Sequence, residues 1–105
     1  MEKLKRKKKI STILEKANPD LAAYLGIDKA FLRDLVAEGV IRSEQSDIIE
    51  NINVTSQKVD TLLKIIKETD NAYDRFVSLL GRPNSNRKDL YEYMKELQAE
   101  EGLSK

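Results

Sequence analysis

The sequence predicts an all-α fold, an antiparallel bundle of six helices, and three observations support it. Apolar residues recur at helical spacing along nearly all of the 105 residues, and no alternating strand pattern competes with them. The four glycines and two prolines stand between the helical segments. Charged residues make up 35% of the chain, which suits helices with solvated outer faces. We expect one domain over residues 1–100 and a frayed tail over residues 101–105.

The first helix is expected over about residues 2–17, and it is very basic. Its inner face holds three apolar residues, Ile10, Ile13 and Leu14. Asn18 and Pro19 then follow, and asparagine is a good N-cap while proline suits the first position of a helix. We therefore expect the first helix to be broken here, with a short second piece over residues 19–25 leaving at an angle.

Two short helices are predicted next. Asp28 is expected to cap a helix that ends at Gly39, and Ser43 to cap the following one. The predicted inner faces of these two helices are Phe31, Leu32, Leu35 and Val36, and Ile48, Ile49 and Ile52. The apolar pair Val40 and Ile41 lies in the turn between them, where we expect it to close one end of the core.

Three longer segments complete the chain. Thr55 or Ser56 is expected to cap the fourth helix. Asp70 or Asn71 is expected to cap the fifth, and the loop at residues 81–86 precedes a sixth that ends near residue 100. Their predicted inner faces are Val59, Leu62, Leu63 and Ile66, then Ala72, Phe76, Leu79 and Leu80, then Leu90, Met94 and Leu97.

Composition excludes most catalytic and metal chemistry. The chain has no cysteine and no histidine, so it lacks thiolate and imidazole ligands, cysteine nucleophiles and histidine bases. Its glycines are scattered and form no phosphate loop. We therefore expect no enzyme activity and no cofactor. The sequence has no apolar run long enough for a membrane span and no secretory signal, and we expect a cytoplasmic protein without membrane contact.

The middle of the chain combines several features. An aliphatic helix ends in the glutamate and glycine of residues 38–39, an apolar pair follows, and the next helix is acidic. A threonine-capped helix carries LLKII at residues 62–66, and residues 70–80 read DNAYDRFVSLL. With these features the chain resembles the caspase recruitment domain, over roughly residues 9–97. The resemblance implies the Greek-key arrangement of the death-fold superfamily, whose first helix is typically split.

A second motif is similar to a sister branch of the same superfamily. The sequence RKDLY at residues 87–91 partly matches the Arg-x-Asp-Leu motif of death effector domains. That motif implies a charge triad with an acid on the second helix, which Asp34 or Glu38 could supply. A death effector domain is therefore an alternative fold assignment.

Charge is distributed unevenly although the net charge is only +1. Residues 1–16 hold seven bases and two acids, whereas residues 17–50 hold three bases and seven acids. The resemblance implies that the first and fourth helices lie side by side and that the second and third lie together on the opposite side. It would then form a basic face from Lys7, Lys8, Lys9, Lys58, Lys64 and Lys67. It would form an acidic face from Asp34, Glu38, Glu44, Asp47 and Glu50.

Two unlike faces on one domain predict a heterologous contact, which makes open arrays unless the rotation closes. The resemblance implies homotypic binding to another caspase recruitment domain, in a caspase, adaptor or scaffold of apoptotic or inflammatory signalling, with self-association. The alternative of a different class is a small helical nucleic-acid-binding protein with a basic arm at residues 3–9. No aromatic residue is interleaved there to stack on bases, so we expect no nucleic-acid partner. The charges can also be solvated helix exteriors alone.

Overall fold

The computed structural model describes residues 2–83 and 85–103, and the side chains from Leu4 onward. This part of the chain folds into six α-helices and contains no strand, which confirms the all-α prediction. The helices are α1 (Glu2–Tyr24), α2 (Lys29–Ala37), α3 (Ser43–Glu50), α4 (Thr55–Glu68), α5 (Ala72–Leu80) and α6 (Lys88–Glu100).

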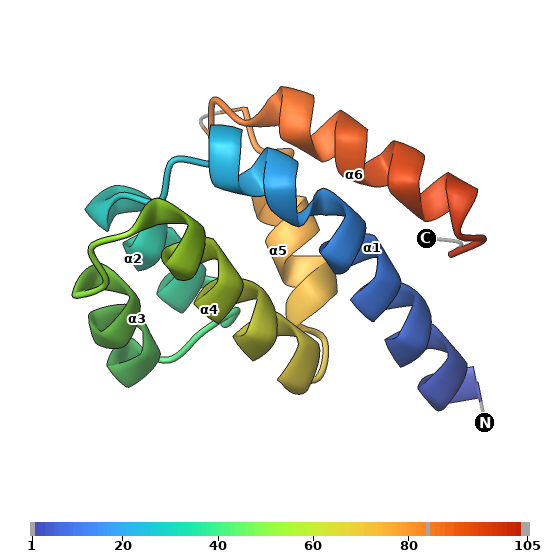
Figure 1. Cartoon of the computed structure of the whole chain (residues 1–105), viewed down its shortest axis with the longest axis horizontal. Helices are drawn as coiled ribbons and strands as arrows, with labels where there is room; N and C mark the ends of the chain where they lie inside the picture. The colour runs from blue at the N-terminus through green and yellow to red at the C-terminus, as the bar shows by residue number, and fades with distance from the viewer. Residues whose placement is uncertain (1, 84, 104–105) are drawn as a thin grey trace.

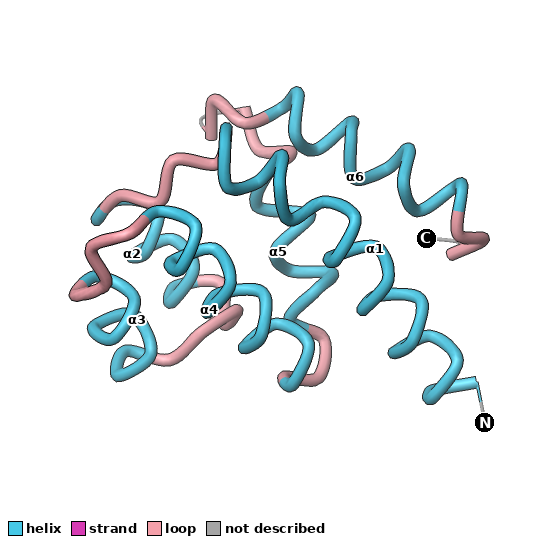
Figure 2. Tube along the Cα trace, viewed as in Figure 1, coloured by secondary structure: helices cyan, strands magenta, loops and turns pink. Residues whose placement is uncertain are grey.

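The helices pack around a single core. α1 lies against α4 and α6, α2 lies against α3 and α5, and α5 also contacts α4 and α6. α2 and α3 occupy one end of the long axis, and the start of α1 and the end of α6 occupy the other, so both chain ends lie at that side (Figure 1). Short loops join the helices (Figure 2). The pairing of α1 with α4 and of α2 with α3 is the pairing that the sequence resemblance implies.

Helical periodicity identified most of the core correctly. All four residues predicted for the inner face of α4 are buried, as are those predicted for α5 and α6. The turn residues Val40 and Ile41 are also buried. Gly39 has φ +76°, and the Val40 N–H donates to the Leu35 carbonyl at 2.9 Å while the Gly39 N–H donates to Val36 at 3.0 Å. This is a Schellman motif, whose closing turn directs Val40 back onto the core.

The same device closes α6, and there the sequence prediction was wrong. Gly102 has φ +73°, its N–H donates to Ala99, and the Leu103 N–H donates to the Gln98 carbonyl at 2.9 Å. Leu103 is buried in the core. The expected fraying of residues 101–105 therefore does not apply to residues 101–103, while Ser104 and Lys105 lie outside the described residues.

The first helix is continuous, contrary to the predicted break, and Pro19 lies inside it. Proline removes one backbone N–H, so the carbonyl of Glu15 loses its helical partner. Both residues are exposed, so water can bind the freed carbonyl. Ala17 and Leu21 are fully buried on either side of the proline, and their contacts with the core keep the segment helical.

Asn18 has a different role from the predicted N-cap. Its side-chain amide donates to the Asp60 carboxylate at 2.7 Å and so ties α1 to α4. The prediction for Asp28 is confirmed, because its carboxylate accepts a bond from the Phe31 N–H at 2.8 Å. At α3 the cap lies one residue earlier than expected, at Arg42, whose backbone N–H donates to the Gln45 side chain.

α4 and α5 begin without a side-chain cap. The capping position of α4 is Val54, so the predicted Thr55 is already the first helical residue. Asn71 precedes α5 as predicted, but it adopts a left-handed conformation with φ +67° and its side chain makes no capping bond. Asparagine tolerates this conformation better than most residues, which explains its presence there.

Candidate protein-interaction surfaces

The three consecutive lysines of α1 point in different directions. Neighbouring residues on a helix diverge by about 100°, so Lys7, Lys8 and Lys9 cannot share one face. Lys7 lines a groove beside the end of α4. Lys9 lies on the opposite flank of the helix, where its Nζ donates to the Gly102 carbonyl at 3.2 Å. Lys8 is exposed on the outer side.

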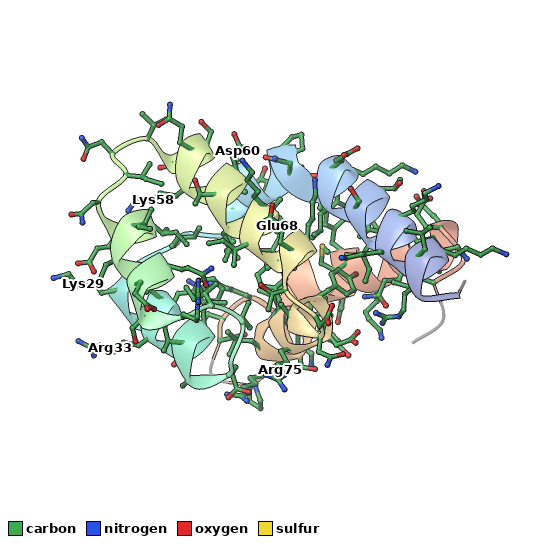
Figure 3. All side chains as sticks on the ribbon, turned by 90° about the horizontal axis from the view of Figure 1, so that it is seen from below. Lys29, Arg33, Lys58, Asp60, Glu68 and Arg75 are labelled. Atoms are coloured by element: carbon green, nitrogen blue, oxygen red, sulfur yellow. The ribbon has the colours of Figure 1, made fainter. Side chains whose placement is uncertain are left out.

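The basic residues of α4 are also dispersed. Lys67 pairs with Glu15 of α1, with 3.6 Å between Nζ and Oε2. Lys64 is exposed, and Asp60 and Glu68 stand one turn on either side of it along the same outer face (Figure 3). Lys58 is half-buried, and its direction is set by its place on the helix, on the opposite flank from Lys67. The predicted basic residues therefore do not form one continuous basic face.

Two of the five predicted acidic residues have cationic partners. Glu50 pairs with Lys29 at 3.5 Å, and Glu38 forms an ion pair with Arg82 at the end of α5. Lys29 and Arg33 point outward from α2 (Figure 3), so the outer side of that helix carries both signs of charge. Asp34 is exposed there.

The acidic character is clearest on α3. Glu44 and Asp47 are exposed on its outer side, and within the described part of the chain neither forms an ion pair. Ile48, predicted to face inward, is 57% exposed instead, whereas its neighbour Ile49 is fully buried. Val54, just after α3, is 48% exposed. We call these four residues the α3 patch: Glu44, Asp47, Ile48 and Val54.

A groove of about 710 Å³ lies where α1 begins, α4 ends and α5 begins. Its apolar lining comes from Ile10, Ile66, Tyr73 and Leu4, and the last of these is 52% exposed. Its charged lining includes Lys7 and Lys67, and Asp70 and Asp74 add two carboxylates. Arg6 also lines it and pairs with Asp74 of α5 at 2.8 Å. We call this feature the α1–α4 groove.

Arg87 does not form the charge triad of a death effector domain. Its Nε donates to the Leu25 carbonyl at 2.8 Å and its Nη2 to the Gly26 carbonyl at 2.7 Å. Its Nη1 donates to the Ser85 carbonyl, and its guanidinium lies 4.1 Å from the centre of the Phe31 ring. The side chain therefore closes the carbonyl end of α1, and the partial motif match has a structural explanation that involves no acid on α2.

A second cleft, of about 530 Å³, lies between the end of α1 and the start of α6. Tyr24, which is 74% exposed, and Tyr93 contribute its aromatic lining, and Asp20 and Asp89 its carboxylates. A hydrogen bond with Asp20, reinforced by burial, raises the pKa of Tyr93 to about 12. Tyr93 therefore keeps its proton to a higher pH than an ordinary tyrosine does.

Within the described residues, no group of three or more acidic side chains is placed to hold a metal ion. None of the helices in the described part is both long and apolar enough to cross a bilayer. Comparison with protein-family models, curated proteins and solved structures found no match.

Proposed function

We propose that the chain is a protein-interaction module that binds domains of its own kind through two unlike surfaces. The observation that carries this proposal is the separation of charge between helices. The outer side of α3 presents Glu44 and Asp47, whereas Lys7 and Lys67 line the α1–α4 groove and Lys64 is exposed on α4. Each surface also carries exposed apolar side chains, Ile48 and Val54 on one and Leu4 on the other.

Two such surfaces favour a heterologous contact between copies. A contact of this kind leaves one free surface at each end of a dimer, so further copies can add unless the rotation closes a ring. Complementary charge contributes mainly to steering and to the choice of partner. Association through exposed charges weakens with salt, because screening acts over a Debye length of about 10 Å at 0.1 M.

The resemblance to caspase recruitment domains extends the proposal to a biological role. In that role, the chain recruits a caspase, adaptor or scaffold that carries a related domain, in cytoplasmic apoptotic or inflammatory signalling. This extension rests on analogy of sequence pattern and fold class. The contact of α1 with α4 and of α2 with α3 supports it, because the resemblance implies those neighbours.

The nucleic-acid alternative has less support. Three bases of α1 already have partners within the domain: Arg6 with Asp74, Lys9 with the Gly102 carbonyl, and Lys16 with Glu101. A gel-shift experiment at two salt concentrations separates the two functions. Nucleic-acid binding predicts a shift that disappears steeply with salt, and the interaction module predicts no shift.

The direct test reverses one charge on each surface. Lys64→Glu and Glu44→Lys should each abolish the self-association of the purified chain, measured by sedimentation velocity. Both residues are exposed, so the free energy of unfolding should change by no more than about 0.5 kcal/mol. Lys95→Glu and Glu92→Lys are matched controls, because they make the same charge changes at exposed positions of α6.

Mixing the two variants adds a second criterion. Each variant keeps one intact surface, so the mixture should form dimers and stop there. Raising salt from about 0.05 to 0.5 M should weaken the association of the unmodified chain. Association of both variants at the unmodified strength, with no effect of salt, would contradict the proposal.

A further inference from the structure

We propose that Ile48 of one copy anchors the contact by inserting into the α1–α4 groove of another copy. This inference rests on the proposed function and specifies where the two surfaces meet. It also changes the expected character of the contact, because an apolar side chain at the centre contributes stability that salt does not screen. The charges around it then determine orientation and register.

The groove has the chemistry to receive an aliphatic side chain. Ile10 and Ile66 are buried beneath it and supply an apolar floor, while Leu4 remains half-exposed at its rim. Its charged lining comprises three bases, Arg6, Lys7 and Lys67, and two acids, Asp70 and Asp74, of which Asp74 pairs with Arg6. An apolar floor whose lining holds more bases than acids fits an aliphatic side chain that is flanked by carboxylates.

The α3 patch has this complementary arrangement. Ile48 is 57% exposed at the surface of a helix whose other apolar residue, Ile49, is fully buried. Glu44 lies one turn before Ile48, and Asp47 lies next to it. Val54, which is 48% exposed, lies four residues after the end of α3, at the capping position of α4. The patch therefore presents an aliphatic side chain with two carboxylates, at one end of the long axis of the domain.

A second copy of the chain is the occupant that these observations favour. The groove and the patch belong to the same sequence, and an excess of bases in the groove complements the two carboxylates of the patch. α3 lies at one end of the domain and the start of α1 at the other (Figure 1), so the patch of a molecule cannot reach its own groove. The contact must then be head-to-tail, which is the heterologous geometry of the proposed function.

Disulfide trapping provides a direct test, because the chain has no cysteine of its own. Ile48→Cys and Lys7→Cys variants are mixed in equal amounts, oxidised mildly and separated on a non-reducing gel. We expect a disulfide-linked heterodimer. The control pair, Ile48→Cys with Lys95→Cys, places the second thiol on exposed α6 and should give little of that product.

Substitution of the anchor gives an independent measurement. Ile48→Ser should weaken self-association by about tenfold or more, as expected for an anchor residue, whereas Ile48→Leu should retain it. Leu4→Ser should have the same direction of effect from the groove side. Both original side chains are about half-exposed, so the urea midpoint of each variant should stay close to that of the unmodified chain.

The outcomes separate this inference from the proposed function. If the chain self-associates and responds to Lys64→Glu, but Ile48→Ser has no effect and the trapped pair gives no more product than the control, the anchor is wrong and the proposed function stands. If the chain remains monomeric at all concentrations, both the anchor and the proposed function are wrong.

Discussion

At the scale of single residues, Arg87 connects three segments that are distant in the sequence. It donates to the carbonyls of Leu25 and Gly26 just after α1, it donates to Ser85 in the loop, and it stacks on Phe31 of α2. The last carbonyls of a helix have no partner within the helix. A planar guanidinium with several donors can bind adjacent carbonyls at once, and a lysine ammonium cannot reproduce that geometry.

Arg87→Lys should therefore lower the free energy of unfolding although it preserves the charge. The loss should be about 1–3 kcal/mol, the usual range when partly buried polar groups lose their partners. Urea unfolding followed by circular dichroism measures it. Lys88→Ala, at the neighbouring exposed position, is the control and should change little. An equal effect of the two substitutions would show that the bonds from Arg87 to these carbonyls do not stabilise the fold.

Tyr73 supplies a pH-dependent contribution to stability. Its hydroxyl accepts a bond from the Gln98 amide at 2.7 Å inside the core, and burial raises the pKa of Tyr73 to about 12 from 10.0. Because the folded state holds the proton more tightly, this contribution is complete below pH 10 and is lost as the pH rises toward 12.

Tyr73→Phe should consequently destabilise the domain at pH 7 and flatten its stability profile above pH 10. The loss at neutral pH should be about 1–3 kcal/mol, since the buried Gln98 amide is left without its acceptor. Urea unfolding at pH 7, 10 and 11 measures both effects. A remaining slope from Tyr93 is expected, because the pKa of that residue is raised in the same direction. A variant whose stability falls above pH 10 as steeply as that of the unmodified chain would contradict the prediction.

Two similar tripeptides show why fraying was wrongly expected at residues 101–103. Glu38-Gly39-Val40 and Glu101-Gly102-Leu103 have the same pattern, and both form a Schellman motif with a buried third residue. The first was recognisable because a further helix follows and supplies a core. The second has only two residues after it, and proximity to the chain end favours an expectation of fraying. Gly102 and Leu103 were the residues from which the second Schellman motif could have been predicted.

At the scale of the helices, the effect of Pro19→Ala on stability can distinguish a broken α1 from a continuous one. In a broken helix Pro19 would occupy the favourable first position, and alanine there would bring no gain. In the continuous helix, Pro19→Ala restores a backbone bond to Glu15.

We therefore expect Pro19→Ala to raise the free energy of unfolding, by up to about 3 kcal/mol. Thermal and urea unfolding measure the change, and Ala23→Gly, an exposed site in the same helix, should lower stability by about 1 kcal/mol as a propensity control. A loss of stability in Pro19→Ala would instead support a first helix that is broken at this position.

Adjacent isoleucines of α3 provide the second test at this scale. Ile49→Ala should cost about 2–5 kcal/mol, because Ile49 is fully buried. Ile48→Ala should stay within about 0.5 kcal/mol, because more than half of that side chain is exposed. Thermal melts of the two variants give the comparison. Equal costs would mean that Ile48 packs inward, as its sequence pattern predicts.

Periodicity worked well for long helices and less well for short ones. In α4, four apolar residues at i, i+3, i+4 and i+7 define one stripe, and all four are buried. α3 has only eight residues, and its apolar residues Ile48 and Ile49 point about 100° apart. The pattern cannot say which of the two faces the core, since neighbouring helices decide it. The break at Pro19 was wrong for a related reason, because buried contacts outweighed a local preference.

At the scale of the whole molecule, charge along the sequence predicted the surface only in part. The acidic middle of the chain does lie on α2 and α3, but Lys29 and Arg82 pair with Glu50 and Glu38. A segment count includes these paired charges as if they were free. The partners come from other helices, so only tertiary packing identifies them. The groove and the exposed Ile48 were beyond sequence analysis for the same reason.

Deleting residues 1–5 tests whether the basic start of α1 contributes to self-association and not to folding. The fold should persist, because the first core residue of α1 is Ile10 and the Arg6–Asp74 pair remains. The melting temperature should change little, whereas self-association should weaken, because the deletion removes Leu4 from the rim of the groove. Sedimentation velocity and a thermal melt measure the two effects. A chain that fails to fold would show that these residues belong to the core.

The position of α1 between α4 and α6 also affects how the domain is made. Of the six helices described, α1 leaves the ribosome first, yet the helices that cover its apolar side are α4 and α6. Its buried face, including Ile13 and Leu14, therefore stays uncovered until α6 has emerged. The nascent chain therefore exposes this apolar face of α1 during most of the synthesis of the domain. Exposed apolar surface favours aggregation during that period. The exposed lysines of α1 are strongly hydrated and repel one another, so they oppose association of the uncovered helix during synthesis.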